Sequence, residues 1–166
     1  TTRQPRTTRA GTAAGTPQDD VTDLPQGRVW DNNPLRDPAA SLAMVDGDSA
    51  TSTGKRFKQV GVNYTNTSLF FDLGTRFPVG RFSFFPRQVG ADEEGRLYRD
   101  DFIRSYDIMV QDGESFSDSD LPVFQTLRTV AFTTASVADV LFPLQFVRYV
   151  RLRVTSTTPF EVAEFQ

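Results

Sequence analysis

The sequence contains no cysteine and no histidine among its 166 residues. Without cysteine, the chain cannot form disulfides, use a thiolate nucleophile or build a cysteine-ligated zinc site. Without histidine, it lacks the usual general base, the Ser-His-Asp triad and the commonest transition-metal ligand. Most familiar hydrolytic chemistry is therefore excluded, whereas a hard cation with oxygen ligands remains compatible with the composition.

Long apolar runs and a strong excess of positive charge are also missing. No stretch approaches the ~20 apolar residues that cross a bilayer, so we expect no membrane span. The net charge is −3 and the basic residues are scattered, which does not indicate a nucleic-acid partner. The chain begins at Thr1 and shows no signal peptide, and we interpret it as a processed mature form.

Phenylalanine, valine and threonine are abundant, and 15 Phe supply most of the bulk for a core. Alternation of apolar and polar residues is clearest over residues 146–154, where Tyr149, Arg151 and Arg153 are expected to face outward. A short helix or an irregular loop is expected over residues 38–44. Turn signals separate the expected strands, which cover residues 56–63, 68–73, 79–85, 102–111, 123–132, 137–144, 146–154 and 162–165. This pattern predicts an all-β, antiparallel sandwich or jelly roll.

Residues 1–27 carry almost nothing to bury and are expected to form an extended N-terminal arm before a body over residues 28–166. The arm contains Arg3, Arg6 and Arg9 and no acid in its first ten residues, whereas the rest of the chain is more acidic than basic. Such an arm could add a strand to the sheet edge of a neighbouring copy. Alternatively, it could lie on its own domain.

An acidic turn is formed by Asp46, Gly47 and Asp48, followed by Thr51. Oxygen ligands packed this closely suit calcium, and the glycine allows the backbone to fold so that they converge. The alternative is a polar Asx-type turn, because Asp-Gly is common turn chemistry. The spacing does not fit an EF-hand loop.

Several segments together resemble the discoidin domain, a galactose-binding-like β-sandwich. They stand in the family's order over residues 28–166: 45–48 with Thr51, 69–74, 106–110 before 112–113, 148–152 and 163–164. The resemblance implies a jelly-roll β-sandwich and a structural calcium held by Asp46, Asp48, Thr51 and Glu164, with Glu161 as a rival for Glu164. It also implies that loops at one end of the sandwich bind glycans, with Tyr98 and Phe57 as the candidate aromatic residues. Few loop aromatics are present, and Ser52 stands where the family usually has an aromatic.

Other polar clusters offer little chemistry. Glu93 and Glu94 could form a carboxylate pair of the kind glycosidases use, but solvated acidic loops are the simpler interpretation. Arg151 and Arg153 could meet an anionic ligand or could pair with acids on an adjacent strand. We therefore expect no enzyme activity.

Two functions follow from these observations. The main expectation is a non-catalytic, extracellular or cell-surface structural subunit that assembles into a filament or surface layer, with its arm packing on other copies of itself. The alternative is a carbohydrate- or cell-surface-binding module of the discoidin type, whose partners would be glycans.

Overall fold

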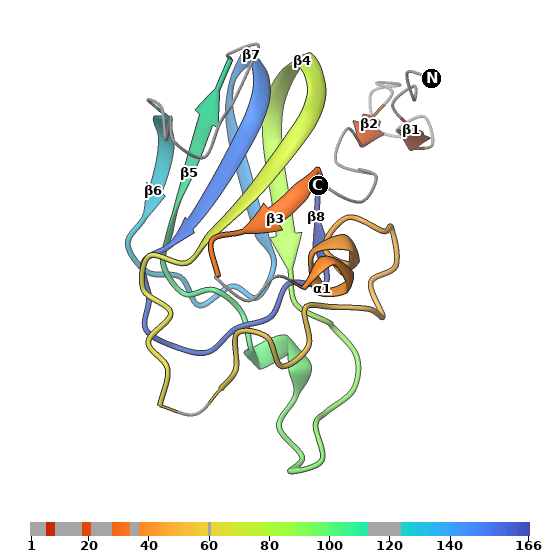
Figure 1. Cartoon of the computed structure of the whole chain (residues 1–166), viewed down its shortest axis with the longest axis vertical. Helices are drawn as coiled ribbons and strands as arrows, with labels where there is room; N and C mark the ends of the chain where they lie inside the picture. Colours follow the sequence, from red (N-terminus) through yellow and green to blue (C-terminus); the bar gives the residue numbers. More distant parts are fainter. Residues whose placement is uncertain (1–5, 9–17, 21–27, 34–36, 60, 113–123) are drawn as a thin grey trace.

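The computed structural model describes residues 6–8, 18–20, 28–33, 37–59, 61–112 and 124–166. In these segments strands dominate, with one short helix and one 3-10 turn (Figure 1). The elements are β1 (Arg6–Thr8), β2 (Gln18–Asp20), β3 (Val29–Asp31), α1 (Pro38–Ala43), β4 (Ser68–Phe85), η1 (Tyr98–Asp100), β5 (Tyr106–Gln111), β6 (Gln125–Val130), β7 (Ala138–Val154) and β8 (Glu164–Phe165). Among the described residues no helix is long and apolar enough to cross a membrane.

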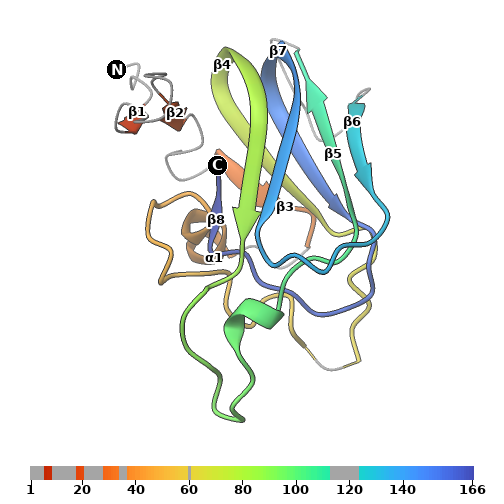
Figure 2. The ribbon, with the colours of Figure 1, turned by 180° about the vertical axis from the view of Figure 1, so that it is seen from behind.

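Two long strands, β4 and β7, organise the sandwich. They pair with each other in antiparallel register over almost their whole length and bend over together (Figures 1 and 2). The bend falls in the register shift between Asp72 and Phe77, where Gly74 has φ +85° and donates its N–H to Asp72 Oδ1. Glycine suits this position because it adopts positive φ at little cost. The bend lets both strands contribute to both layers.

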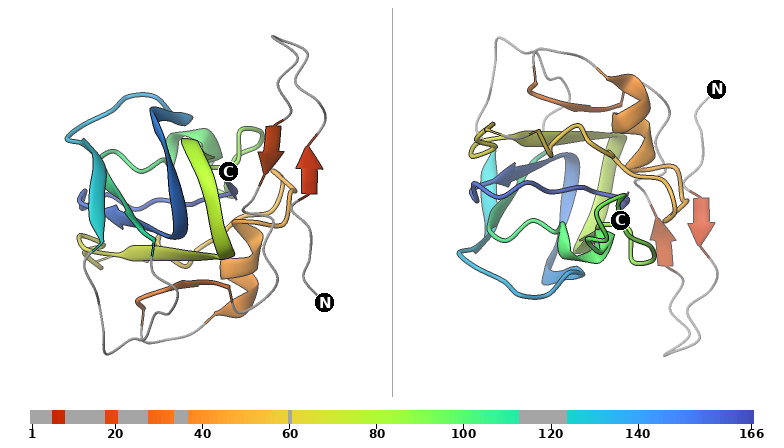
Figure 3. Two further views of the ribbon diagram at one scale, coloured as in Figure 1. Left: turned by 90° about the horizontal axis from the view of Figure 1, so that it is seen from above. Right: turned by 90° about the horizontal axis from the view of Figure 1, so that it is seen from below.

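The two layers share a single hydrogen-bonded sheet in the order β3-β4-β7-β5-β6, with β8 on the far part of β4. The first half of β4 and the second half of β7 lie between β3 and β5. The other halves form the second layer, where β8 pairs with β4 at Phe84 and Phe85 (Figure 3). This arrangement confirms the predicted antiparallel β-sandwich.

Phenylalanine rings fill the space between the layers. Phe165 of β8 lies at the centre, stacked on Phe71 with ring centroids 4.1 Å apart and near Phe82 and Phe84 at 5.6 and 5.9 Å. The inward-facing residues expected from the alternation are buried: Leu69, Phe71, Leu73, Val150, Leu152 and Val154. Tyr149 lies on the outer side as expected, but it is buried there in a second cluster with Phe70, Met109 and Phe124.

Several predicted boundaries were wrong. The strands expected over 68–73 and 79–85 form one element, as do those over 137–144 and 146–154, because the bends interrupt the register without ending the pairing. The described residues 56–59 and 61–63 contain no strand. Instead, Phe57 and Tyr64 pack around Phe160 beneath a turn. Residues 38–44 contain a helix, which Asp37 caps by accepting the N–H of Ala40 at 3.1 Å.

The described part of the arm consists of β1 and β2, which form a separate two-stranded antiparallel sheet. Arg6 is the register partner of Asp20, and Thr8 that of Gln18. Arg3 and Arg9 lie outside the described residues. The described part of the arm therefore contains a strand pair, and the extended arm over residues 1–27 stays a prediction.

Candidate functional site

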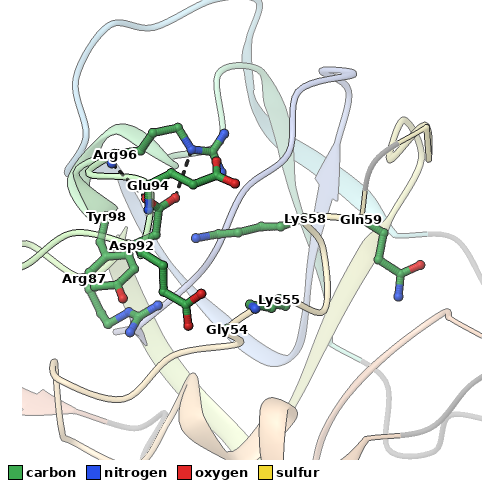
Figure 4. A pocket seen from close by; sticks show the side chains of 10 residues that line it. Gly54, Lys55, Lys58, Gln59, Arg87, Asp92, Glu94, Arg96 and Tyr98 are labelled. Atoms are coloured by element: carbon green, nitrogen blue, oxygen red, sulfur yellow. Dashed lines mark hydrogen bonds and ion pairs between the residues drawn. The ribbon is translucent and has the colours of Figure 1, made fainter.

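A pocket of about 420 Å³ opens between the loop over residues 54–59 and the long loop that follows β4 (Figure 4). These loops lie at the end of the sandwich opposite the bends of β4 and β7 (Figure 1). The lining residues are almost all polar or charged: Gly54, Lys55, Lys58, Gln59, Arg87, Asp92, Glu93, Glu94, Arg96 and Tyr98. Such a surface offers hydrogen-bond donors and acceptors rather than an apolar cavity.

A buried carboxylate holds two of the pocket's cations from behind. Glu161 is 1% exposed and accepts hydrogen bonds from Lys58 Nζ (2.7 Å), from Arg87 Nε (2.9 Å) and Nη2 (2.8 Å), and from the Arg87 backbone N–H (3.1 Å). Burial alone would raise the pKa of Glu161, but the hydrogen bonds and positive charges of Arg87 and Lys58 outweigh it and lower the pKa. Glu161 is therefore ionised and fully engaged.

Lys58 is shared between two acids. Its Nζ also donates to Asp101 Oδ2 at 2.5 Å, and its side chain is only 10% exposed. Lys58, Arg87, Asp101 and Glu161 therefore form a charge-balanced cluster of two cations and two carboxylates. Because a buried ion pair is stable only when each group keeps its partners, this cluster fixes the direction of both cations.

Tyr98 is held in place by the same cluster. The guanidinium carbon of Arg87 lies 3.6 Å from the centre of the ring, and Lys58 Nζ lies 5.5 Å from it. Gly90, at φ +96°, approaches the ring so closely that a Cβ there would come within 3.2 Å of it. Arg87 covers one face of the ring, so Tyr98 does not present the two open faces of a free stacking platform.

The rim of the pocket is built by a tight loop. Asp92 Oδ1 accepts the backbone N–H groups of Arg96 (2.8 Å) and Glu94 (3.0 Å), and its Oδ2 accepts from Arg96 Nε (2.9 Å). The backbone hydrogen bond from Arg96, followed by that of its side chain, lowers the pKa of Asp92. In the described part of the chain, Lys55 and the carboxylates of Glu93 and Glu94 form no hydrogen bond or ion pair, so these charges are available to a ligand.

The predicted ligand-binding residues divide between two places. Tyr98 lines the pocket, but Phe57 is 1% exposed and stacks on Phe160 at 4.7 Å, so it cannot offer a face to a ligand. Arg151 and Arg153 lie on β7, outside the pocket. Arg153 Nε donates to Asp107 Oδ2 (3.0 Å) on the neighbouring strand, which is the alternative interpretation of this row.

Lys58, Arg87 and Asp101 were not recognised as site residues from the sequence. Lys58 and Arg87 reach Glu161, and Asp101 reaches Lys58, from loops that are distant along the chain, and no local pattern marks them. Glu161 itself was considered only as a rival calcium ligand. Both of its oxygens accept hydrogen bonds from Lys58 and Arg87, and its role as a calcium ligand stays a prediction.

The acidic turn satisfies its own hydrogen bonds. Asp46 accepts the N–H of Asp48 (2.9 Å) and the hydroxyl of Thr51 (2.6 Å), and Asp48 Oδ1 accepts the N–H of Ala50 (2.9 Å). These contacts match the Asx-type turn that was the alternative to a metal site. Glu164 is buried in β8. No three carboxylates among the described residues converge to hold a metal ion.

Calcium bound by Asp46, Asp48, Thr51 and Glu164 stays a prediction, and chelation tests it. If calcium binds only the folded state, removing it with EDTA lowers the melting temperature, because the ion stabilises that state by mass action. Asp46→Asn should abolish the effect of EDTA. An unchanged melting temperature in EDTA would leave the turn as a hydrogen-bonded element without metal.

Comparison with known proteins identifies relatives by structure only. No family model and no curated sequence matches the chain. A chitosan-binding module in complex with chitotriose, from a Paenibacillus chitosanase/glucanase, superposes with a TM-score of 0.62 at 15% identity, covering 87% of this chain and 97% of that one. The chain has the discoidin-like β-sandwich fold. This confirms the predicted resemblance at the level of fold.

Two family 32 carbohydrate-binding modules of Clostridium perfringens give the same result. One is in complex with GalNAc-β-1,3-galactose, with a TM-score of 0.58 at 19% identity, covering 86% of this chain and 96% of that one. The other is in complex with galactose, with a TM-score of 0.58 at 18% identity, covering 85% and 93%. At these identities the likeness shows the discoidin-like fold and leaves the ligand of this chain to be tested.

Proposed function

We propose that the chain is a non-catalytic carbohydrate-binding module and that the pocket between residues 54–59 and 87–98 is its glycan site. The pocket carries this proposal, because it combines an ordered aromatic ring with polar groups of both signs at one loop end of the sandwich. The neighbours with bound sugars support it, since all three share the fold. The carbohydrate-binding module, which was the alternative hypothesis from the sequence, thus replaces the structural subunit as the main hypothesis.

The charges of the pocket favour one class of sugar. Lys58 and Arg87 are neutralised by Asp101 and Glu161, whereas Glu93 and Glu94 remain unpaired within the described chain, and Lys55, the lining cation without an ion pair there, balances only one of these two negative charges. A ligand with an amino group would meet these two carboxylates through charge-assisted hydrogen bonds. Sugar hydroxyls would accept from Lys55 and donate to the same rim. We therefore propose an amino-sugar glycan as the preferred ligand.

Neither a catalytic role nor an intracellular one is supported. Lys58 engages Asp101, and Lys58 and Arg87 engage Glu161, so neither carboxylate is poised to transfer a proton to a ligand. Glu93 and Glu94 line the pocket, and we assign them to binding rather than to proton transfer. Binding modules for such glycans act where the glycans are exposed, and we propose an extracellular or cell-surface location. Self-assembly through Arg3, Arg6 and Arg9 of the arm stays a prediction.

Titration calorimetry with chitotriose tests the proposed function. Glu93→Gln/Glu94→Gln is expected to weaken binding at least about tenfold, since a hydrogen bond to a charged group is worth about 1.5–3 kcal/mol. Tyr98→Ala should weaken it further, whereas Phe132→Ala, which removes an exposed ring outside the pocket, should not. Galactose should bind more weakly than chitotriose. Equal affinity of all variants would contradict the assignment.

A further inference from the structure

A second surface is formed by apolar side chains on the outer side of β7. Leu141, Leu144 and Phe146 are 66%, 72% and 56% exposed, while their neighbours Val140 and Val147 are buried in the core. We call these three residues the β7 surface. Exposed apolar groups gathered on one strand mark a contact site more often than scattered ones do.

The backbone geometry gathers these side chains into one face. Leu141 is opposite Arg81 on β4, and Phe146 is opposite Pro78, close to the bend. Leu144 packs over Gly80, where an added Cβ would lie 3.5 Å from its Cδ1. The absence of a side chain at Gly80 thus leaves room for Leu144, and the β7 surface lies beside β4 in the second layer.

Strand addition does not explain this surface. Within the described chain, the first half of β7 pairs with no strand other than β4, so its other edge carries no strand, although Arg128 Nη2 of β6 donates to the Leu141 carbonyl (2.8 Å). Pro143 interrupts that edge with a residue that has no N–H to donate, which is a common protection against added strands. A partner is therefore expected to cover the face through side chains.

The charges around the β7 surface fit a second copy of the chain. Arg81 and Asp139 form a bidentate ion pair (2.7 and 3.0 Å) at one side, and both remain about half exposed. Near the bend, Arg76 pairs with Asp112 and its guanidinium lies 5.1 Å from the ring of Phe146. In each pair, both the positive and the negative side chain are about half exposed to solvent. A copy related by a two-fold axis can therefore place its arginines against the aspartates of the first.

We propose that the chain forms a two-fold dimer through the β7 surface. The bends of β4 and β7 lie at the end of the sandwich opposite the loops that frame the pocket (Figure 2), so the dimer leaves both pockets open. Two open pockets would raise the avidity for a glycan-bearing surface, a consequence that rests on the proposed function. Dimer formation itself does not depend on it.

Sedimentation equilibrium of the full chain, without glycan, tests the dimer. The wild type should shift from monomer to dimer with rising concentration, and Leu144→Asp should raise the dimer dissociation constant about a hundredfold, because each dimer carries the change twice. Leu141→Asp is a second variant, and circular dichroism confirms that both remain folded. Val89→Asp, which charges an exposed residue of the long loop, should leave the dimer unchanged.

A variant of the arm separates this interface from the one expected from the sequence. Substituting Arg3, Arg6 and Arg9 with alanine should leave the dimer intact. Loss of the dimer in this variant would place self-association in the arm and overturn the proposal. A wild type that stays monomeric would also overturn the proposal. So would a dimer that Leu144→Asp and Leu141→Asp leave unchanged, because the contact would then lie on another face of the protein.

Discussion

Replacing Glu161 with glutamine is expected to lower the free energy of unfolding by about 3–5 kcal/mol, the usual cost of removing one partner from a buried ion pair. Glutamine keeps the shape of the side chain but removes the charge that faces Lys58 and Arg87. Arg87 would then lack its carboxylate partner, and the cover over Tyr98 would loosen. Urea unfolding measures the change, and the same variant should bind chitotriose more weakly.

The lowered pKa of Glu161 also predicts how the stability of the protein changes with pH. The pKa of Glu161 is lowered in the folded protein, so its contribution is complete above the unfolded-state value of about 4.3 and is lost as the pH falls through the folded value. Glu161→Gln should therefore flatten the acid limb of the stability curve. Glu93→Gln is the matched control, because Glu93 is exposed and should change stability by less than about 0.5 kcal/mol. A Glu161→Gln variant as stable as the wild type would contradict the role of this cluster.

Phe165→Ala is expected to destabilise the protein by about 3–5 kcal/mol, the range for removing a fully buried phenylalanine. Phe165 has no exposed surface and contacts the rings of Phe71, Phe82 and Phe84, so its loss opens a cavity between the two layers. It would also weaken β8, which is only two residues long. In a domain of this size the melting temperature should fall by roughly 10 °C.

The matched control for this substitution is Phe132→Ala. Phe132 is 69% exposed, so its removal should shift the melting temperature little. If the two variants melted alike, the stack around Phe165 would not be the centre of the core.

The alternation of apolar and polar residues in the sequence predicts which side of each strand faces the space between the two layers. Leu69, Phe71 and Leu73, like Val150 and Leu152, show the face that points inward, because side chains alternate across a strand. The sequence does not show that β4 and β7 continue through their bends. Gly74 looks like the end of a strand, and only the pairing with β7 keeps the two halves in one element.

The pocket is less visible in the sequence than the fold. Lys58 and Glu161 are 103 residues apart, and Arg87 reaches Glu161 across 74. Each is an ordinary charged residue in a polar loop until the fold brings them together. Phe57 shows the opposite difficulty: an aromatic in a loop end was expected to meet a ligand, but the turn at 54–57 directs its ring into the core.

The most direct test of the account is a crystal structure of the protein with chitotriose. We expect the sugar between the loop of residues 54–59 and that of residues 92–98, with an amino group near Glu93 or Glu94 and its ring beside Tyr98. Sugar bound at any other surface, such as the bends of β4 and β7, would contradict the assignment of this pocket as the glycan site.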